Sequence, residues 1–180
     1  MHFTTTLMVA ATALASLAAA NSVHFVNQDS TRRTVVFTAQ EQGEGNGVAI
    51  PSITIEGNGT ADQEFPEGWI GNWYTVSEGA KDVPGMLGEV RFNGYNDATF
   101  FDVSAIVNPN DVNGVKMVYP ASSQLPVSGC QTFPCANAYN LPDDIATLST
   151  NEKNLVSLIG NKENKKRGIN SRVNRAYLTT

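Results

Sequence analysis

The chain has 180 residues, of which 41% are hydrophobic and 16% are charged, and it contains only two cysteines. This composition excludes a collagen-like, disulfide-dense or wholly disordered chain and favours one globular domain with a single core. The formal net charge of −5 conceals an uneven distribution, because residues 21–161 hold 16 acidic and 6 basic residues, a net −10. A net −10 over residues 21–161 argues against a nucleic-acid partner, because binding to phosphate normally depends on Lys and Arg.

The N-terminus has the features of a secretory signal peptide. Residues 1–20 carry no Asp, Glu, Lys or Arg, and an apolar run from Leu7 to Leu17 ends in three alanines. A membrane anchor is the alternative, but the run is too short to cross a bilayer, and no second apolar run of about 18 residues follows it. We therefore expect cleavage before Asn21, secretion, and a mature protein that does not associate with the membrane.

Short runs with strand-like alternation recur between residues 21 and 161, separated by turn-forming residues such as Gly57-Asn58-Gly59. No segment has a sustained helical periodicity. The predicted strands are Val23 to Val26, Thr34 to Thr38, Ser52 to Ile55, Ile70 to Val76, Leu87 to Phe92, Thr99 to Val107, Val115 to Tyr119 and Leu155 to Ile159. The pattern predicts an all-β domain over residues 21–161, an antiparallel β-sandwich or flattened barrel. Asn58 begins an Asn-x-Thr sequon and is a candidate glycosylation site.

Two of the predicted strands place carboxylates on one face of a sheet. Successive side chains of a strand alternate between its faces, so Glu89 and Arg91 share a face. If residues 93–97 close a hairpin, Glu89 lies directly across from Asp102, and Arg91 lies across from Phe100. Like charges in that position destabilise a sheet unless Arg91, solvent or a function compensates. The sequence therefore indicates a site at this hairpin.

Several aromatic residues are candidates for either the core or a sugar-binding surface. Trp69 and Trp73 share one face of their predicted strand and Tyr74 has the other, so we expect at least one of these sets in the core. Tyr95 lies in the turn and is the better candidate for an exposed ligand contact.

The C-terminal half contains three further features. Cys130 and Cys135 are expected to form a disulfide that closes a short loop. The segment from Asn108 to Gly114 has oxygen ligands suited to calcium, but its spacing differs from an EF-hand loop, and an Asn-rich turn is the preferred interpretation. Residues 162–180 carry a net +5 without regular periodicity and are predicted to form a disordered basic tail. Two other interpretations of this tail are a dibasic processing site at Lys165 to Arg167 and a C-terminus that was mispredicted in the gene.

Five short motifs together resemble the thaumatin-like family. They are Val23-His-Phe-Val-Asn-Gln, Gly68-Trp-Ile-Gly-Asn-Trp, Leu87-Gly-Glu-Val, Phe100-Phe-Asp-Val-Ser-Ala-Ile and Ala138-Tyr-Asn-Leu-Pro-Asp-Asp, and they follow the family's order over residues 22–150. The chain also resembles small secreted fungal proteins of this type, some of which are labelled as DNases. The resemblance implies a thaumatin-like β-sandwich.

In the thaumatin-like family, a cleft lined by Arg, Glu and Asp is associated with carbohydrate binding, especially of β-1,3-glucan. The resemblance implies that Glu89 corresponds to the family Glu and Asp102 to its first Asp. Val107 occupies the place of the second Asp, for which Asn108 or Asp111 is a substitute only after a shift. Arg91 follows the Glu instead of preceding it.

Two hypotheses of different classes follow. The preferred one is a secreted, monomeric, non-catalytic binding protein whose partner is cell-wall polysaccharide or, for an effector or antigen, a host protein. Its candidate ligand-binding residues are Glu89, Arg91, Tyr95, Asp102 and Asp111.

The alternative is a weak hydrolase that uses Glu89 and Asp102 as acid and base. A nuclease is less favoured, because the acidic body repels phosphate and the mature chain retains one histidine, His24. We expect no cofactor and no bound metal.

Overall fold

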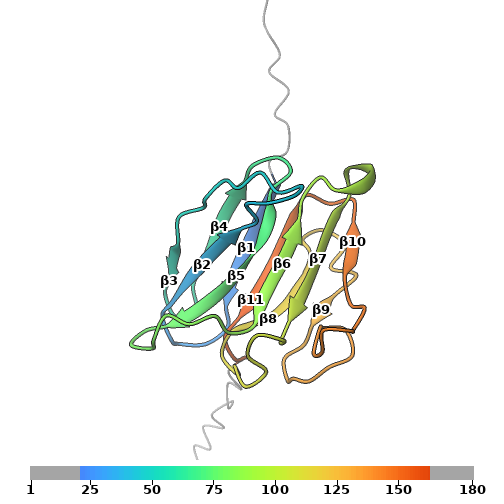
Figure 1. The fold of residues 1–180 in the computed structure, drawn as a ribbon. Helices are drawn as coiled ribbons and strands as arrows, with labels where there is room; N and C mark the ends of the chain where they lie inside the picture. Colours follow the sequence, from blue (N-terminus) through green and yellow to red (C-terminus); the bar gives the residue numbers. More distant parts are fainter. Residues whose placement is uncertain (1–20, 163–180) are drawn as a thin grey trace, which may run out of the picture.

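The computed structural model describes residues 21–162, which form two β-sheets (Figure 1). The five-stranded sheet has the order β4 (Thr60–Phe65), β1 (Asn21–Asn27), β11 (Asn154–Ile159), β8 (Val115–Pro120) and β9 (Ser128–Gly129). The six-stranded sheet has the order β10 (Leu148–Thr150), β7 (Thr99–Ser104), β6 (Leu87–Arg91), β5 (Ile70–Ser77), β2 (Arg33–Ala39) and β3 (Ile53–Ile55). Apart from the 3-10 turn η1 (Tyr95–Asp97), residues 21–162 contain no helix. None of these residues therefore belongs to a helix that could span a membrane.

The predicted all-β class is confirmed, and every predicted strand has a counterpart. All strand pairs are antiparallel except β1 with β11, which run parallel. Three strands were missed. β9 and β10 are very short, and β4 has no apolar face because only Phe65 of its six residues is buried. β7 ends at Ser104, short of the predicted Val107, which is exposed. The predicted signal peptide and most of the predicted basic tail lie outside the described residues.

The core lies between the sheets because their strands alternate between inward and outward side chains. Phe25 of β1 meets Trp73 of β5 edge to face, with ring centroids 5.6 Å apart. The indole Nε1 of Trp73 donates a 3.1 Å hydrogen bond to Oγ of Ser157 in β11, which links the two sheets. Trp69 and Trp73 are fully buried and Tyr74 is nearly so. The two tryptophan rings belong to the core between the sheets and cannot stack on a sugar, whereas Tyr74 lies on the other face of β5, where its hydroxyl donates a 2.8 Å hydrogen bond to Oδ1 of Asp82.

Gly88 in β6 makes room for the Trp73 ring. A Cβ atom at position 88 would lie 2.4 Å from Cε2 of Trp73, closer than atoms in a core approach. We expect Gly88→Ala to lower the free energy of unfolding by about 1–3 kcal/mol, because the packed core must shift to admit a methyl group. Urea denaturation of both proteins measures this difference. An unchanged midpoint would show that the core is looser than the structure indicates.

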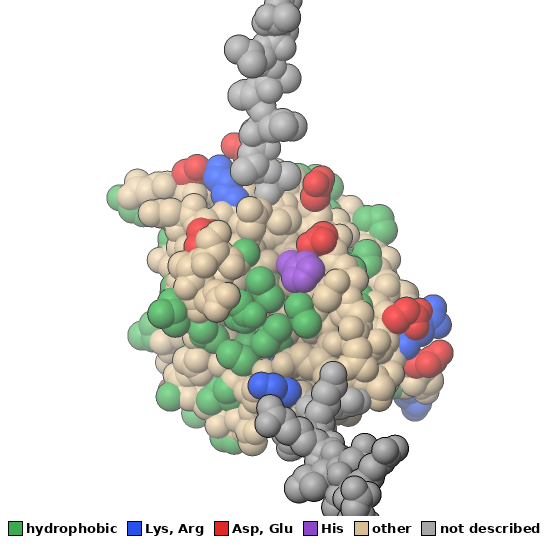
Figure 2. All heavy atoms as spheres, turned by 180° about the vertical axis from the view of Figure 1, so that it is seen from behind, with side chains coloured by type: hydrophobic (Ala, Val, Ile, Leu, Met, Phe, Trp, Pro, Cys, Tyr) green, Lys and Arg blue, Asp and Glu red, His purple; other side chains and the backbone are tan. Residues whose placement is uncertain are grey.

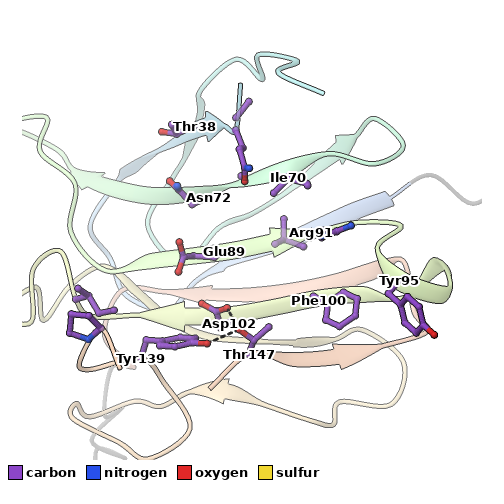
Figure 3. A pocket seen from close by; sticks show the side chains of 16 residues that line it. Thr38, Ile70, Asn72, Glu89, Arg91, Tyr95, Phe100, Asp102, Tyr139 and Thr147 are labelled. Atoms are coloured by element: carbon purple, nitrogen blue, oxygen red, sulfur yellow. Dashed lines mark hydrogen bonds between the residues drawn. The ribbon is translucent and has the colours of Figure 1, made fainter. Parts of the chain in front are cut away.

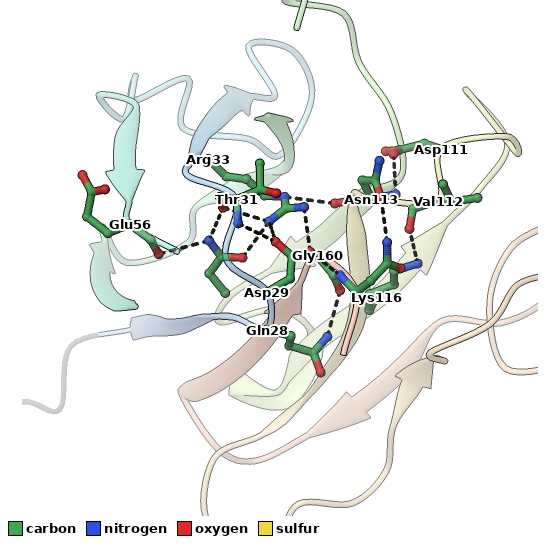
Figure 4. Close-up of polar contacts among 12 residues, drawn as sticks. Gln28, Asp29, Thr31, Arg33, Glu56, Asp111, Val112, Asn113, Lys116 and Gly160 are labelled. Carbon is green, nitrogen blue, oxygen red and sulfur yellow. Dashed lines mark hydrogen bonds and ion pairs between the residues drawn. The ribbon is translucent and has the colours of Figure 1, made fainter. Parts of the chain in front are cut away.

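A buried ionic network closes one end of the sandwich (Figure 4). The side chain of Arg33 is 2% exposed, and its Nη2 donates to Oδ2 of Asp29 at 2.9 Å while Nη1 bonds Oδ1 at 2.5 Å. Nη1 also donates to Oδ1 of Asn27 at 2.7 Å, and Nε donates to the Asn113 carbonyl at 3.2 Å. Burial alone would raise the pKa of Asp29, but hydrogen bonds from Arg33, Thr31 and Asn161 and the positive charge of Arg33 lower it to about 2.

The outer faces of the two sheets differ in chemistry. Figure 2 shows the outer face of the five-stranded sheet, where apolar side chains gather beside His24. On this face Val156 pairs with Tyr119, and Leu158 pairs with Met117, all of them half-buried. The outer face of the six-stranded sheet instead carries the carboxylates that the sequence places on β6 and β7.

Candidate functional site

A groove of about 750 Å³ runs across the outer face of the six-stranded sheet (Figure 3). Its floor is formed by β2, β5, β6 and β7, and residues from the segment before β10 form one wall. The volume lies in the range of small-ligand sites. The sequence-predicted candidates Glu89, Arg91, Tyr95 and Asp102 all line this groove. The fifth candidate, Asp111, does not.

Two parallel rows of side chains make up the floor. The strand register places Thr38 beside Asn72, Asn72 beside Glu89, and Glu89 beside Asp102. We call these four residues, with Thr147, the polar row. The next row outward along the strands holds Ile70, Arg91 and Phe100. The two rows are two residues apart on each strand, about 6–7 Å. The groove therefore offers hydrogen-bonding groups alongside an aromatic ring.

Glu89 and Asp102 form the centre of the polar row. They are direct cross-strand neighbours, so the predicted register of the hairpin is confirmed, as is the pairing of Arg91 with Phe100. Oδ2 of Asp102 accepts a 3.1 Å hydrogen bond from the Thr147 hydroxyl, which lies 2.9 Å from the Tyr139 hydroxyl. Oδ1 of Asp102 has no donor among the described residues. The strand register places Glu89 directly beside Asp102.

The surroundings of Asp102 favour its protonated form near neutral pH. Asp102 is only 7% exposed, and its burial disfavours the charged form. Burial first, then the negative charge and hydrogen bonding of Glu89, raise the pKa of Asp102 to about 7, although the Thr147 hydrogen bond acts in the opposite direction. The carboxyl of Asp102 is therefore a hydrogen-bond donor below about pH 7, at which an ordinary Asp is fully ionised.

Arg91 does not neutralise the two carboxyls, although the sequence suggested that role. Its guanidinium is paired with Glu44, in the loop between β2 and β3. Tyr95, in η1, is 77% exposed at the open end of the groove. The Arg91 guanidinium and the Tyr95 ring thus both point away from the acid pair, toward the end of the groove that holds Phe100 (Figure 3).

No protein-family model matches the chain. The antigenic protein SchS21 of Stachybotrys chartarum is 51% identical over 139 residues, which are 77% of this chain and 94% of that protein. The chain belongs to the SchS21 family. Because the match spans nearly the whole of SchS21, it includes far more than one short motif.

The fold of this SchS21-family protein has a solved counterpart. The crystal structure of the protein elicitor MoHrip2 from Magnaporthe oryzae superposes with a TM-score of 0.53 at 14% identity, covering 78% of this chain and 99% of that one. At this identity the likeness concerns the fold alone.

The thaumatin-like assignment was wrong. The curated relative is SchS21, and the MoHrip2 fold differs from that of thaumatin. The motifs misled because they reflect a general property of sandwich strands. Phe101 and Val103 must face the core, so Asp102 between them must face outward in any such fold.

Asp111 of the SchS21-family chain has a local structural role near the ionic network of Figure 4. Its Oδ2 accepts a 2.8 Å hydrogen bond from the Met86 amide, and its Oδ1 accepts one from the Asn113 amide at 3.1 Å. A Cβ atom at Gly85 or Gly114 would lie about 2 Å from this carboxylate, which therefore fills a space that two glycines leave open. Burial lowers the pKa of nearby Lys116, and the charge of Asp111 counteracts that effect.

Two other predicted features can be placed. Cys130 and Cys135 form a disulfide, as expected. Asn58 is exposed in the turn between β3 and β4, where a glycan would meet solvent, so it stays a predicted glycosylation site. Within residues 21–162, no three His, Cys, Asp or Glu side chains gather in a way that could hold a metal ion.

Sequence reasoning missed several groove residues, namely Asn72, Phe100, Tyr139 and Thr147 as ligand-facing groups and Glu44 as the partner of Arg91. Asn72 and Phe100 could have been found, because they lie beside Glu89 and Arg91 in the predicted strand pairing. Tyr139 and Thr147 come from a loop whose position depends on the whole fold. No sequence signal identified them.

Proposed function

We propose that this protein is a secreted, monomeric, non-catalytic binding protein of the antigen or elicitor kind, and that cell-wall polysaccharide is the ligand of its groove. SchS21 is an antigenic protein and MoHrip2 is a protein elicitor, and these likenesses support the first part. The disulfide is consistent with an oxidising, extracytoplasmic location.

The groove is the observation that carries the polysaccharide proposal. With the thaumatin resemblance removed, its support is the arrangement of the polar row beside Phe100. Sugars present alternating hydroxyl groups and flat apolar ring faces, and protein sites for small ligands combine apolar or aromatic walls with a few polar groups that fix orientation. An open groove across four strands also suits a chain-like ligand, which must extend beyond the site at both ends.

The geometry of the acid pair favours binding over hydrolysis. Glycosidases hold their two carboxyl groups about 5–5.5 Å apart for retention, or about 6.5–9.5 Å apart for inversion, so that the sugar or a water fits between them. Asp102 instead is only 7% exposed and its Oδ2 is held by the Thr147 hydroxyl, so little of this carboxyl is open to a substrate.

Depletion onto insoluble polymers tests the proposal. We expect the purified protein to bind β-1,3-glucan, chitin or cellulose without releasing reducing sugar. Phe100→Leu keeps an apolar side chain but removes the flat ring, and we expect it to weaken that binding by about three- to tenfold.

Tyr119→Leu is the matched control, because it removes an aromatic ring from the outer face of the opposite sheet. Its binding should equal that of the unmodified protein. Absence of binding to every polymer, or equal losses in the two variants, would refute the groove as a polysaccharide site. Release of sugar that Glu89→Gln abolishes would favour the hydrolase instead.

A further inference from the structure

The acid pair lacks a cationic partner. Among residues 21–162 no Lys or Arg forms an ion pair with Glu89 or Asp102, and the one arginine of the groove is already paired with Glu44. Like charges directly across a sheet cost stability. A buried carboxyl with an unpartnered oxygen also costs free energy, unlike one that is fully hydrogen-bonded. When both carboxyls are ionised, the sheet bears both costs at the centre of its groove.

A bound cation would remove both costs at once. An ammonium group has three donors, enough for Oδ1 of Asp102, the Glu89 carboxylate and one neighbour such as the Asn72 side-chain amide oxygen. A neutral hydroxyl has a single donor and supplies no charge. The body's net charge of −10 also attracts cations to the protein from a distance.

The rest of the groove limits what can carry that ammonium. The rings of Phe100 and Tyr139 flank the acid pair, one from β7 and the other from the wall (Figure 3). They suit a ligand with a flat, partly apolar ring next to its amine. A simple metal ion does not use these rings, and a flexible alkyl amine gains little from them.

We propose that the groove recognises an amino-sugar polymer with free amines, a chain of glucosamine units, one of whose ammonium groups sits between Glu89 and Asp102. This inference rests on the proposed function and names the class of polysaccharide. The sugar ring that bears the ammonium lies over the aromatic side chains, and its hydroxyl groups meet Asn72 and Thr147. The chain continues along the open groove in both directions.

Isothermal titration calorimetry at about pH 5.5 tests this with two probes that differ only in their amines. The probes are a glucosamine tetramer and an N-acetylglucosamine tetramer, and a neutral β-1,3-glucan tetramer serves as the third arm. We expect the free amines to bind at least about tenfold more tightly than the acetylated amines. Raising the ionic strength from about 0.05 to about 0.5 M should weaken only the binding of the glucosamine tetramer.

Two variants separate a specific contact from general attraction. Glu89→Gln should reduce the preference for free amines to about twofold or less, because the ion pair is lost while the groove keeps its shape. Glu64→Gln removes an exposed carboxylate from β4 in the other sheet and should leave the preference intact. Equal effects of the two variants would overturn the proposal, since the binding would then reflect the net charge alone.

The outcomes also separate this inference from the proposed function. Equal binding of all three tetramers, sensitive to Phe100→Leu, would overturn the amino-sugar preference and leave the polysaccharide site in place. Binding of none of them, together with no depletion onto polymers, would overturn both.

Discussion

Arg33→Ala should lower the free energy of unfolding by about 3–5 kcal/mol, a large part of the stability of an ordinary domain. The substitution removes the donors that Asp29, Asn27 and the Asn113 carbonyl use, and it leaves a buried carboxylate without its counter-ion. Breaking a buried pair by removing one partner is costly because the other charge stays buried. Urea denaturation at neutral pH measures the loss.

The preceding residue provides a matched control. Arg32 also forms ion pairs, with Glu56 at 3.0 Å and with Glu78 at 3.5 Å, but its side chain is 48% exposed. We expect Arg32→Ala to cost less than about 1 kcal/mol. Similar losses for Arg32→Ala and Arg33→Ala would show that the Arg33 network contributes no more than a surface ion pair.

The same network predicts an acid transition. The pKa of Asp29 is about 2 in the folded protein, against 3.8 for an ordinary Asp, so its contribution to stability is complete above about pH 4 and is lost as the pH falls through 2. In Arg33→Ala the pKa of Asp29 should return toward its ordinary value. The slope of stability against pH between about 4 and 2 should therefore be shallower in that variant.

Asp102→Asn should stabilise the protein in a pH-dependent way. The pKa of Asp102 is raised from 3.8 to about 7, so between these values the folded protein keeps a proton that the unfolded chain releases. Its contribution to stability is complete below about pH 4 and is lost as the pH rises through about 7. Asp102→Asn introduces a neutral amide that can donate to Glu89. We expect little difference from the unmodified protein at pH 4 and a gain of about 2–4 kcal/mol at pH 8.

Denaturation curves at several pH values between 4 and 8 measure this gain. The groups that face Asp102 are Glu89 from β6 and Thr147 and Tyr139 from the wall, while Arg91 farther along β6 is held by Glu44. Asp143→Asn changes an exposed Asp and should have little effect at any of these pH values. A gain from Asp102→Asn that is the same at pH 4 and pH 8 would contradict the raised pKa of Asp102.

Local patterns in the sequence predicted the strand pair at the centre of the site. Alternation alone placed Glu89 and Arg91 on one face, and the turn length set Glu89 across from Asp102. Alternation also placed Trp69 and Trp73 on a shared face, and both proved to be core residues. These features depend on neighbouring residues, whose geometry is determined by the strand itself.

The features that were missed depend on contacts distant in sequence. Glu44 reaches Arg91 from another loop, and Thr147 reaches Asp102 across 45 residues. β4 is an edge strand with two mostly polar faces, so it lacks the alternation by which strands are recognised. Asp111 was matched to a ligand-binding position through a sequence shift, whereas its surroundings show a carboxylate that anchors the Met86 amide.

The parallel pairing of β1 with β11 has a consequence for how the chain folds. β11 is the middle strand of the five-stranded sheet, and its contacts with β1 include the hydrogen bond from Ser22 to Asn154 across 132 residues of sequence. During synthesis that sheet therefore lacks its central strand until β11 has been made. Such non-local pairing makes folding slow. Formation of the five-stranded sheet therefore depends on strands at both ends of the described part of the chain.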